Sequence, residues 1–362
     1  MDLSSLGDGT FGLWTRPQAL ALMTRGTLNR IASRSWQIPF TGVYADAGYE
    51  LSAVQWAQAA VLASGGAGQP MEYGEPRADG SRRSRPGAVA CGRSAARVWG
   101  LPLIDDADPA THATEYLLHD VQVWRSLPTM TAPARAGGPS RAGGPGRAGG
   151  PDRAGGPDRA GGPDRPQLRR HRLTGLGGGL VQHGTGLWLT TPLRTALDCV
   201  TLVSPEAAVC VLDDGLHREL FTSAELTAAV AARAGKPGAT ALRAAVASAD
   251  GRSESPNETL ARLLLQPMLP GLEPQVQLHD ERGRILARFD LGDRAVRLAV
   301  DMDGKRGHAG EAMVAKDRKR DRASARHGWW TERGTWWEVR RDQAAFVARV
   351  EQRWDVLRAR AA

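Results

Sequence analysis

The sequence predicts a multidomain α+β protein. A chain of 362 residues is long enough for two or three domains. It opens with a pattern of two short helices and two short strands, and its last part mixes strands with helices. A repetitive segment interrupts the region between them. We therefore expect a winged helix-turn-helix over 10–46, a middle α/β region over 47–134 and 166–248 that is split by 135–165, and an α/β/α domain over 252–362.

The charge of the chain points to a polyanionic partner. The formal net charge is +8, and 41% of the residues are hydrophobic against 24% charged. This composition is ordinary for a soluble globular protein, and the basic excess favours nucleic acid as a ligand. The three cysteines show no CxxC spacing, which argues against a disulfide framework and against a zinc site. They are Cys91, Cys199 and Cys210.

The chain shows no targeting or membrane segment. Its first residues, MDLSSLGDGTFG, lack the basic start and the apolar stretch of a signal peptide. No apolar run reaches the length that is needed to cross a bilayer. We therefore expect a soluble cytoplasmic protein without a membrane partner.

Residues 135–165 repeat the unit RAGGPx five times. The unit contains no large apolar side chain, so the segment cannot bury a core, and its glycine and proline oppose helix and strand. The composition predicts a disordered spacer. A loose contact of its arginines with nucleic acid is the alternative.

Residues 12–45 carry the start and stop signals of a helix-turn-helix with a wing. Thr15 is placed to cap a helix, with Gln18 at the capping-box position. Gly26 is expected to end that helix and Thr27 to begin the next, after which WQIPFTGVYA predicts two strands and a turn. A small helical domain for protein contact is the alternative. A recognition helix at this place would present to DNA the side chains of Arg25, Asn29, Arg30 and Arg34.

The same stretch resembles the N-terminal domain of AbiEi-type antitoxins, which belong to type IV toxin–antitoxin systems. The shared pattern is a helix, a glycine, a second helix and an aromatic wing, here Trp36 and Gly42-Val43-Tyr44. The segments AVACGRSAARVWGLPL (88–103) and LTTPLRTALDCV (189–200) also resemble the middle region of those proteins. The resemblance implies DNA binding, often at the protein's own promoter, and a cognate toxin as a partner.

After residue 252 the chain predicts a helix, several strands and two more helices. The first helix, SPNETLARLLLQPML, has Ser255 as its N-cap and Pro256 at its first position. The later segments are predicted as the strands EPQVQLHD, ILARFDLGD and RLAVDMDG, a basic helix EAMVAKDRKRDRASARHG that Gly328 ends, the strand WWEVRR, and the helix RDQAAFVARVEQRWDVLRARA. The last helix carries on one face Phe346, Val350, Trp354 and Leu357.

These segments resemble the restriction-endonuclease-like fold with its PD-(D/E)XK active site, and within it the very-short-patch-repair-like family of bacterial proteins. The matching residues are Glu258 in the first helix, Asp290 in FD, the run VDMDGKRGH, and DRKRDRASARHGWW followed by WEVRR. The resemblance covers the last quarter of the chain and implies a metal-dependent endonuclease. It implies as catalytic residues Asp290, Asp301, Asp303, Lys305, His308 and Glu258, with Asp290 and Asp301 as metal ligands.

Phosphodiester hydrolysis explains why carboxylates at strand ends would be needed. A Mg²⁺ ion positions the attacking water and relieves charge on the phosphate, and it takes one or two carboxylates plus waters. Asp290 and Asp301 on neighbouring strands can converge on one such ion, for which Mn²⁺ can substitute. Asp301 and Asp303 share a face, because strand residues two apart point alike. Lys305 or His308 would hold the phosphate or the attacking hydroxide.

Each of these residues also has a structural explanation. The lysine of (D/E)xK is missing, because Asp303 stands at its position. Glu258 can complete a capping box, Asp303 can belong to a turn, and Lys305 and His308 can be surface side chains. Two hypotheses therefore stay open. One is a metal-dependent DNA endonuclease, and the other is a non-catalytic antitoxin-type regulator with a degenerate nuclease domain.

A run of basic residues follows the carboxylates. Its members are Lys316, Arg318, Lys319, Arg320 and Arg322. The acids between them, Asp317 and Asp321, allow salt bridges on a solvated helix face. Because the run is so close to the carboxylates, we expect contact with phosphate. The predicted nucleic-acid contacts of this helix are Lys316, Lys319 and Arg320.

Overall fold

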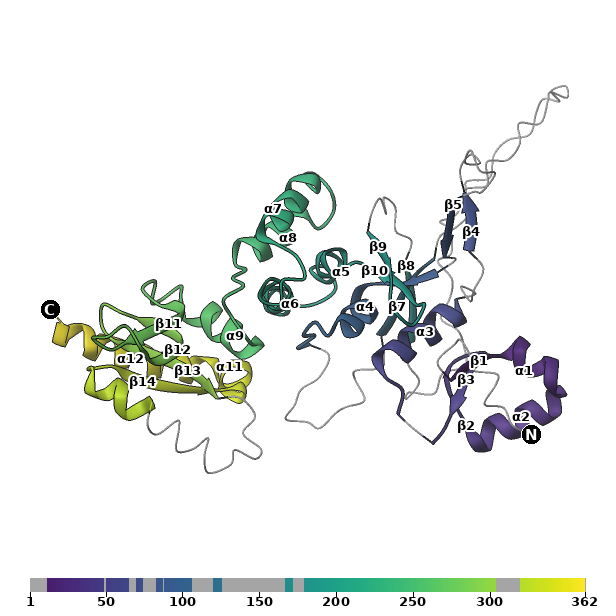
Figure 1. Ribbon diagram of the computed structural model, residues 1–362, viewed down its shortest axis with the longest axis horizontal. Coiled ribbons are helices and arrows are strands. Elements are labelled where there is room, and N and C mark those ends of the chain that lie inside the picture. Colours follow the sequence, from purple (N-terminus) through teal and green to yellow (C-terminus); the bar gives the residue numbers. More distant parts are fainter. Residues whose placement is uncertain are drawn as a thin grey trace, which may run out of the picture.

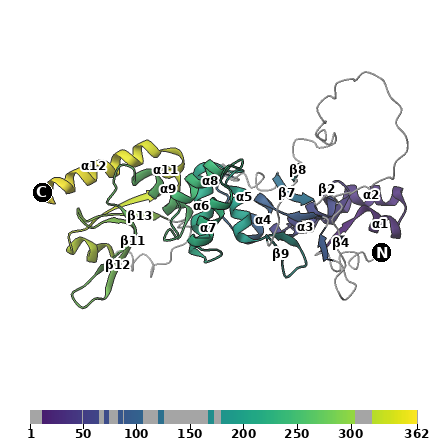
Figure 2. The ribbon, with the colours of Figure 1, turned by 90° about the horizontal axis from the view of Figure 1, so that it is seen from above.

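A computed structural model of the protein describes residues 12–48, 50–64, 70–73, 83–86, 88–105, 120–125, 167–171, 179–303 and 320–361. Within these ranges the chain is a mixed α/β protein with sheets of two to five strands. An N-terminal unit, a middle region and a C-terminal domain follow one another in a row (Figure 1; Figure 2). The RAGGPx repeat lies outside the described residues. None of the helices in these ranges is both long and apolar enough to cross a membrane.

The N-terminal unit is a small antiparallel sheet with two helices. Its sheet has the strand order β1-β3-β2, and the predicted pair of strands in WQIPFTGVYA is confirmed. Leu28 of the second helix is buried against Trp14 and Tyr44. The elements in chain order are β1 (Leu13–Thr15), α1 (Arg16–Leu22), α2 (Arg25–Ser35), β2 (Trp36–Phe40) and β3 (Val43–Asp46).

Capping side chains determine where the first two helices begin. Thr15 and Gln18 form the predicted capping box, in which the amide and the hydroxyl of Thr15 donate to Oε1 of Gln18 over 2.7 and 2.8 Å. The predicted boundary at Gly26 and Thr27 is wrong, because α2 begins before both residues and contains them. The cap is Thr24, whose hydroxyl oxygen accepts from the amide of Thr27 over 3.3 Å. This bond pairs an amide of the first turn that has no partner within the helix. The helix therefore begins directly after Thr24, and Gly26 lies inside it.

The middle region is built on a five-stranded sheet of order β8-β7-β6-β10-β9. Two of its neighbouring strands, β6 (Ala88–Ala90) and β10 (Trp188–Thr190), run parallel, and each is followed by a helix, α4 (Gly92–Trp99) and α5 (Pro192–Cys199). Two segments far apart in the sequence therefore form one layer. The remaining elements are α3 (Ala53–Ala63), β7 (Asp120–Arg125), β8 (Gln167–His171) and β9 (Leu180–Gln182), with a separate ribbon of β4 (Pro70–Tyr73) and β5 (Arg83–Pro86).

Helices connect this sheet to the C-terminal domain. They are α6 (Pro205–His217), α7 (Ser223–Ala232) and α8 (Ala239–Ala247), and with α5 they enclose a core around Leu212, Leu226 and Leu242. α5 carries an ion pair between Arg194 and Asp198, which are four residues apart and 2.9 Å from each other. The helices lie between the two sheets in both views (Figure 1; Figure 2).

The C-terminal domain is a four-stranded mixed sheet with helices. The strands β11, β12 and β13 are antiparallel in sequence order, and β14 pairs parallel to β13. One core contains Leu298 and Val300 of β13 with residues of α9 and α12, and another contains Phe289, Ala299 and Trp329. The elements are α9 (Pro256–Leu265), β11 (Glu273–His279), β12 (Ile285–Asp293), β13 (Leu298–Asp303), β14 (Trp330–Thr335), α11 (Trp336–Arg341) and α12 (Gln343–Ala361).

The prediction of a strand at WWEVRR is wrong, because this segment is helix α11. The strand lies one segment earlier, at WTERGT. A capping box explains the difference. The amide and hydroxyl of Thr335 each donate to Oε2 of Glu338 over 2.9 Å, and the Glu338 amide donates back to Thr335. These local bonds favour a helix in spite of an aromatic composition that is typical of strands.

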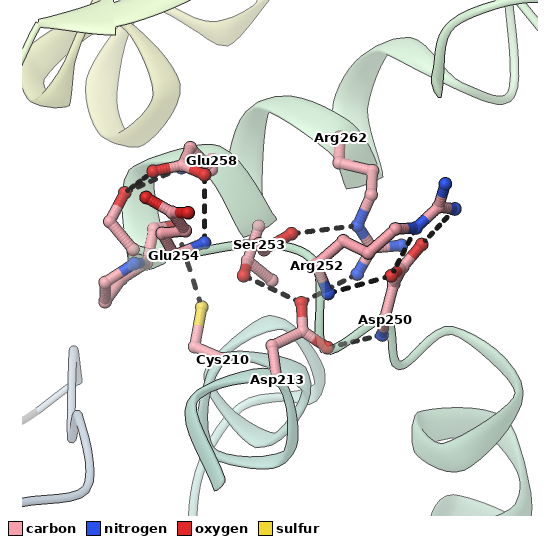
Figure 3. A network of polar contacts seen from close by, with 11 residues as sticks. Cys210, Asp213, Asp250, Arg252, Ser253, Glu254, Glu258 and Arg262 are labelled. Atoms are coloured by element: carbon pink, nitrogen blue, oxygen red, sulfur yellow. Dashed lines mark hydrogen bonds and ion pairs between the residues drawn. The ribbon is translucent and has the colours of Figure 1, made fainter. Parts of the chain in front are cut away.

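A buried ion pair joins the middle region to the C-terminal domain. Asp213 of α6 and Arg262 of α9 lie 2.8 Å apart, with side chains that are 2% and 4% exposed. Asp213 also accepts from the Thr259 hydroxyl and from the Asp250 amide, and Nε of Arg262 donates to the Ser253 hydroxyl (Figure 3). Both buried charges therefore have polar partners besides each other, which a buried ion pair needs in order to be stable.

Candidate active site

The two aspartates that the sequence predicts as metal ligands face each other across neighbouring strands. The antiparallel register pairs Leu291 of β12 with Val300 of β13, so the next pair outward is Asp290 and Asp301. Oδ2 of Asp290 accepts from the amide of Met302 over 2.7 Å, and the amide of Asp290 donates to Oδ1 of Asp301 over 3.3 Å. The side chains of the two acids thus hold the strands together where the main-chain ladder ends.

Burial raises the pKa of both carboxyl groups above the ordinary value of an aspartate. Asp301 is 4% exposed, and Asp290 is half-buried. Desolvation and the charge of Glu258 raise the pKa of Asp290 to about 6. Desolvation and the charge of Asp290 raise the pKa of Asp301 to about 6, although the positive charge of Arg320 opposes this. Two neighbouring carboxylates in such a place repel each other unless a proton or a cation intervenes.

Glu258 reaches the cluster from the first turn of α9. Its Oε1 accepts from the Ser255 hydroxyl over 2.8 Å, and its Oε2 accepts from the Glu254 amide over 2.9 Å (Figure 3). Its Oε2 also accepts from Nε2 of Gln275 over 2.8 Å. The amide of Glu258 also donates to the Ser255 hydroxyl, which confirms Ser255 as the N-cap, but the predicted capping box is not formed because the amide that donates back to Glu258 is that of Glu254. Burial raises the pKa of Glu258, and its charge in turn raises the pKa of Asp290.

A cation of the chain itself contacts the cluster. Nη2 of Arg320 donates to Oδ2 of Asp301 over 2.7 Å. The Nε of Arg320 is buried and has no partner in the part of the chain that the structure describes. Arg320, which the sequence suggests as a phosphate contact, therefore lies directly on one of the proposed metal ligands.

Asp303 is held by a second arginine that the sequence does not point to. Arg333 of β14 donates through Nη1 to Oδ1 of Asp303 over 3.2 Å, and through Nη2 to both oxygens of Asp321 over 2.8 and 3.0 Å. The parallel register places Arg333 across from Asp301. Only the pairing of β13 with β14 reveals this neighbour, because spacing along the chain carries no information about it.

The structure brings together Glu258, Asp290 and Asp301, with Asp303 at the end of the same strand. The other predicted site residues, Lys305, His308, Lys316 and Lys319, lie outside the described residues. Gln275 was not predicted, and its contact with Glu258 adds an uncharged member to the cluster. No motif could have identified it, since a glutamine in a strand is unremarkable by itself.

The oxygens left for a metal ion belong to Asp290 and Asp301. Oδ1 of Asp290 accepts no hydrogen bond from the described residues, and Oδ1 of Asp301 accepts only the 3.3 Å bond from Asp290. Both oxygens of Glu258 already have donors. In the described ranges no three acidic, histidine or cysteine side chains are arranged to hold an ion. Mg²⁺ often takes one or two carboxylates and completes its shell with water, so Asp290 and Asp301 are the residues that could hold a hydrated Mg²⁺ or Mn²⁺ ion.

The N-terminal unit exposes the predicted DNA-contacting side chains on α2. They are Arg25, Asn29, Arg30 and Arg34, and all four are exposed. An adjoining cavity of about 610 Å³ lies between α2 and the β2–β3 turn. Its polar lining comes from Arg16, Asn29, Ser33 and Thr41. The surface beside the predicted recognition helix is thus both basic and hollowed.

Two curated proteins match part of the chain, and both are described as uncharacterized proteins of Mycobacterium tuberculosis, from two strains. Each is 31% identical over 179 residues, which make up 49% of this chain and 66% of the relative. The match therefore spans slightly less than two thirds of the relatives' own length. No family model and no solved structure matches the chain.

Proposed function

We propose that the protein binds DNA through its N-terminal unit and hydrolyses phosphodiester bonds through its C-terminal domain, with Mg²⁺ or Mn²⁺. One observation carries the catalytic part. The side chain of each of the two residues, Asp290 and Asp301, accepts a hydrogen bond from the main chain of the neighbouring strand. Both carboxyl groups are desolvated, and burial raises both pKa values to about 6. A divalent cation there would replace repulsion by attraction and would position a water against a bound phosphate.

The roles in this proposal follow from which atoms have partners. Asp290 and Asp301 hold the metal through their Oδ1 atoms. Glu258, whose oxygens already accept hydrogen bonds, acts on Asp290 through its charge. Lys305 and His308 are proposed to bind the phosphate or the attacking hydroxide, as the resemblance to restriction-endonuclease-like proteins implies.

The DNA-binding part of the proposal rests on the exposed side chains of α2. The order of helices and strands in the N-terminal unit is compatible with a winged helix-turn-helix, in which α2 would enter the major groove. The arginines there would contact phosphates and Asn29 a base edge. Together with the basic charge of the chain, they favour DNA over a protein partner.

One contact favours a second candidate function. Arg320 donates to Asp301 over 2.7 Å and so supplies this carboxylate with a cation from the chain itself. A domain neutralised in this way would need no metal. In that case the protein is a non-catalytic DNA-binding regulator of antitoxin type, with a toxin as its partner and a degenerate nuclease domain kept for binding or assembly.

A nuclease assay separates the two candidates. The full chain is incubated with Mg²⁺ or Mn²⁺ and with double-stranded DNA, single-stranded DNA or RNA. We expect cleavage of DNA that is lost in Asp290→Asn and kept in Asp355→Asn, because Asp355 is an exposed residue of α12. Tight DNA binding without cleavage under any of these conditions would support the regulator instead.

A further inference from the structure

Gln275 combines two unfavourable features within strand β11. Its backbone has φ of 55°, in the left-handed region that side chains other than those of glycine and asparagine avoid. Its Oε1 is buried and has no donor among the described residues. Each feature destabilises a protein, and features of this kind gather at functional sites, where neighbouring residues impose them.

Glu258 determines how the amide of Gln275 is oriented. Nε2 of Gln275 donates to Oε2 of Glu258 over 2.8 Å. The opposite orientation would place Oε1 against a carboxylate oxygen, so that two acceptors would face each other. The unpaired Oε1 is therefore a consequence of the bond that Gln275 makes to Glu258.

The sheet is irregular at the position that faces Gln275. The β11–β12 register on both sides places Gln275 across from Asp290. Phe289 packs with Trp329 in one core, whereas Leu291, two residues later, packs in the other core with α9 and α12. Residues two apart in a regular strand share a face. The alternation of side chains between the two faces of the sheet is therefore interrupted in β12 at Asp290.

The residue type at this irregularity is informative. A strand position that needs a left-handed residue normally has glycine, since glycine adopts this conformation without steric strain. This chain has glutamine instead. Glycine would relieve the backbone but would lack the amide that donates to Glu258.

We propose that Gln275 is a positioning residue, which ties Glu258 of α9 to the sheet and so sets its place beside Asp290. The other groups that face Glu258 are the Ser255 hydroxyl and the amide and charge of Glu254, both from the start of its own helix, and the charge of Asp290. Among the described residues, Gln275 is thus the one donor to Glu258 that comes from the sheet. The role in catalysis rests on the proposed function, whereas the positioning itself does not.

Two substitutions separate the backbone of Gln275 from its side chain. Gln275→Gly relieves the left-handed φ and removes the amide, while Gln275→Asn tolerates that φ but is one methylene too short to reach Glu258. Glu219→Gly is the matched control, because Glu219 also has φ of 55° and is exposed in the turn after α6. In metal-free buffer we expect both glycine variants of the full chain to keep or raise the thermal midpoint.

The side chain's effect is measured on Glu258 itself. Carbon-13 NMR of the full chain with labelled glutamate follows the carboxyl signal of Glu258. The loss of that signal in Glu258→Gln assigns it. Without the amide donor, the titration of this carboxyl should move up by about one pH unit in both Gln275 variants and stay unchanged in Glu219→Gly. In the cleavage assay, the Mn²⁺ concentration for half-maximal rate should rise about tenfold, the lower end of the effect of removing an outer partner at a metal site, because Glu258 would no longer be held beside Asp290.

The outcomes distinguish this proposal from the proposed function. An unmoved Glu258 titration in Gln275→Asn overturns the positioning role, whatever happens to cleavage. A Gln275→Gly variant that melts lower and has an unmoved Glu258 titration shows that the glutamine serves stability alone. A chain that cleaves no substrate but shows the shifted titration keeps the positioning role and overturns the nuclease.

Discussion

The main-chain amide of Asp290 donates to Oδ1 of Asp301 over 3.3 Å, across the end of the β12–β13 pair. In the other direction, Oδ2 of Asp290 accepts from the amide of Met302 over 2.7 Å. The two acids thus replace the ladder bonds of their strands, and burial raises the pKa of each to about 6. Near neutral pH this arrangement destabilises the folded protein, and a proton or a cation relieves it.

Asp290→Asn should stabilise the metal-free protein at about pH 8 by roughly 1–3 kcal/mol and have little effect at about pH 4. The pKa of Asp290 in the folded protein, about 6, lies above the ordinary value of 3.8. The contribution of this group to stability is therefore complete below pH 3.8 and is lost as the pH rises through 6. Urea unfolding at both pH values measures the difference. Asp355→Asn is the control, and a destabilised Asp290→Asn at the higher pH would contradict the burial argument.

Mg²⁺ or Mn²⁺ should raise the thermal midpoint of the full chain, because an ion that binds only the folded state stabilises it by mass action. The rise should be larger at about pH 8 than at about pH 5, since protons compete for the same carboxylates. It should vanish in Asp290→Asn. Differential scanning fluorimetry over a series of metal concentrations tests this, with Ca²⁺ as a second hard cation. A rise that persists in Asp290→Asn would place the metal elsewhere.

Arg320→Met should destabilise the metal-free protein by roughly 1–3 kcal/mol at neutral pH, because it leaves the buried Asp301 without its partner. Adding Mn²⁺ should restore much of this loss if the arginine and the metal neutralise the same carboxylate. Arg322→Met is the matched control, since Arg322 is exposed and lies with Arg320 in the helical segment 320–326. Equal effects of the two substitutions would show that the Arg320–Asp301 contact contributes nothing measurable.

Arg30→Ala should weaken binding to duplex DNA and lower the slope of log affinity against log salt by about one for each lost phosphate contact. The reason is that Arg30 is exposed on α2 and would release a bound counterion on neutralising a phosphate. Fluorescence anisotropy at several salt concentrations measures both quantities. Arg243→Ala, at an exposed position of α8, should change neither. An unchanged slope in Arg30→Ala would remove α2 from the interface.

Arg262→Met should cost about 3–5 kcal/mol of stability, since it leaves the buried carboxylate of Asp213, between α6 and α9, without its positive partner. Desolvation raises the pKa of Asp213, and Arg262 opposes that rise. The loss should therefore be smaller at low pH, where Asp213 can take up a proton. Chemical unfolding of Arg262→Met beside Arg252→Met tests this. Arg252 is a suitable control because its side chain is 57% exposed, so its removal leaves no deeply buried charge without a partner.

The sequence by itself determined those elements whose signals are local. Thr15 with Gln18, and Ser255 with Glu258, predict helix starts correctly because each capping bond joins residues three apart. Such local signals can also mislead when two of them compete. The segment WWEVRR has the composition of a strand, yet the bond between Thr335 and Glu338 makes it a helix.

The candidate site needed the tertiary structure. The sequence identified Asp290 and Asp301 as candidate site residues. Their hydrogen bond, however, depends on the strand register, and a shift of one residue would turn the side chains of a strand to the opposite face. The contact of Arg320 with Asp301 spans 19 residues and that of Gln275 with Glu258 spans 17. Contacts over such separations arise from how strands pair and helices pack. For that reason the strained glutamine and the contact of Arg320 with the proposed metal ligand Asp301 became visible only in the folded chain.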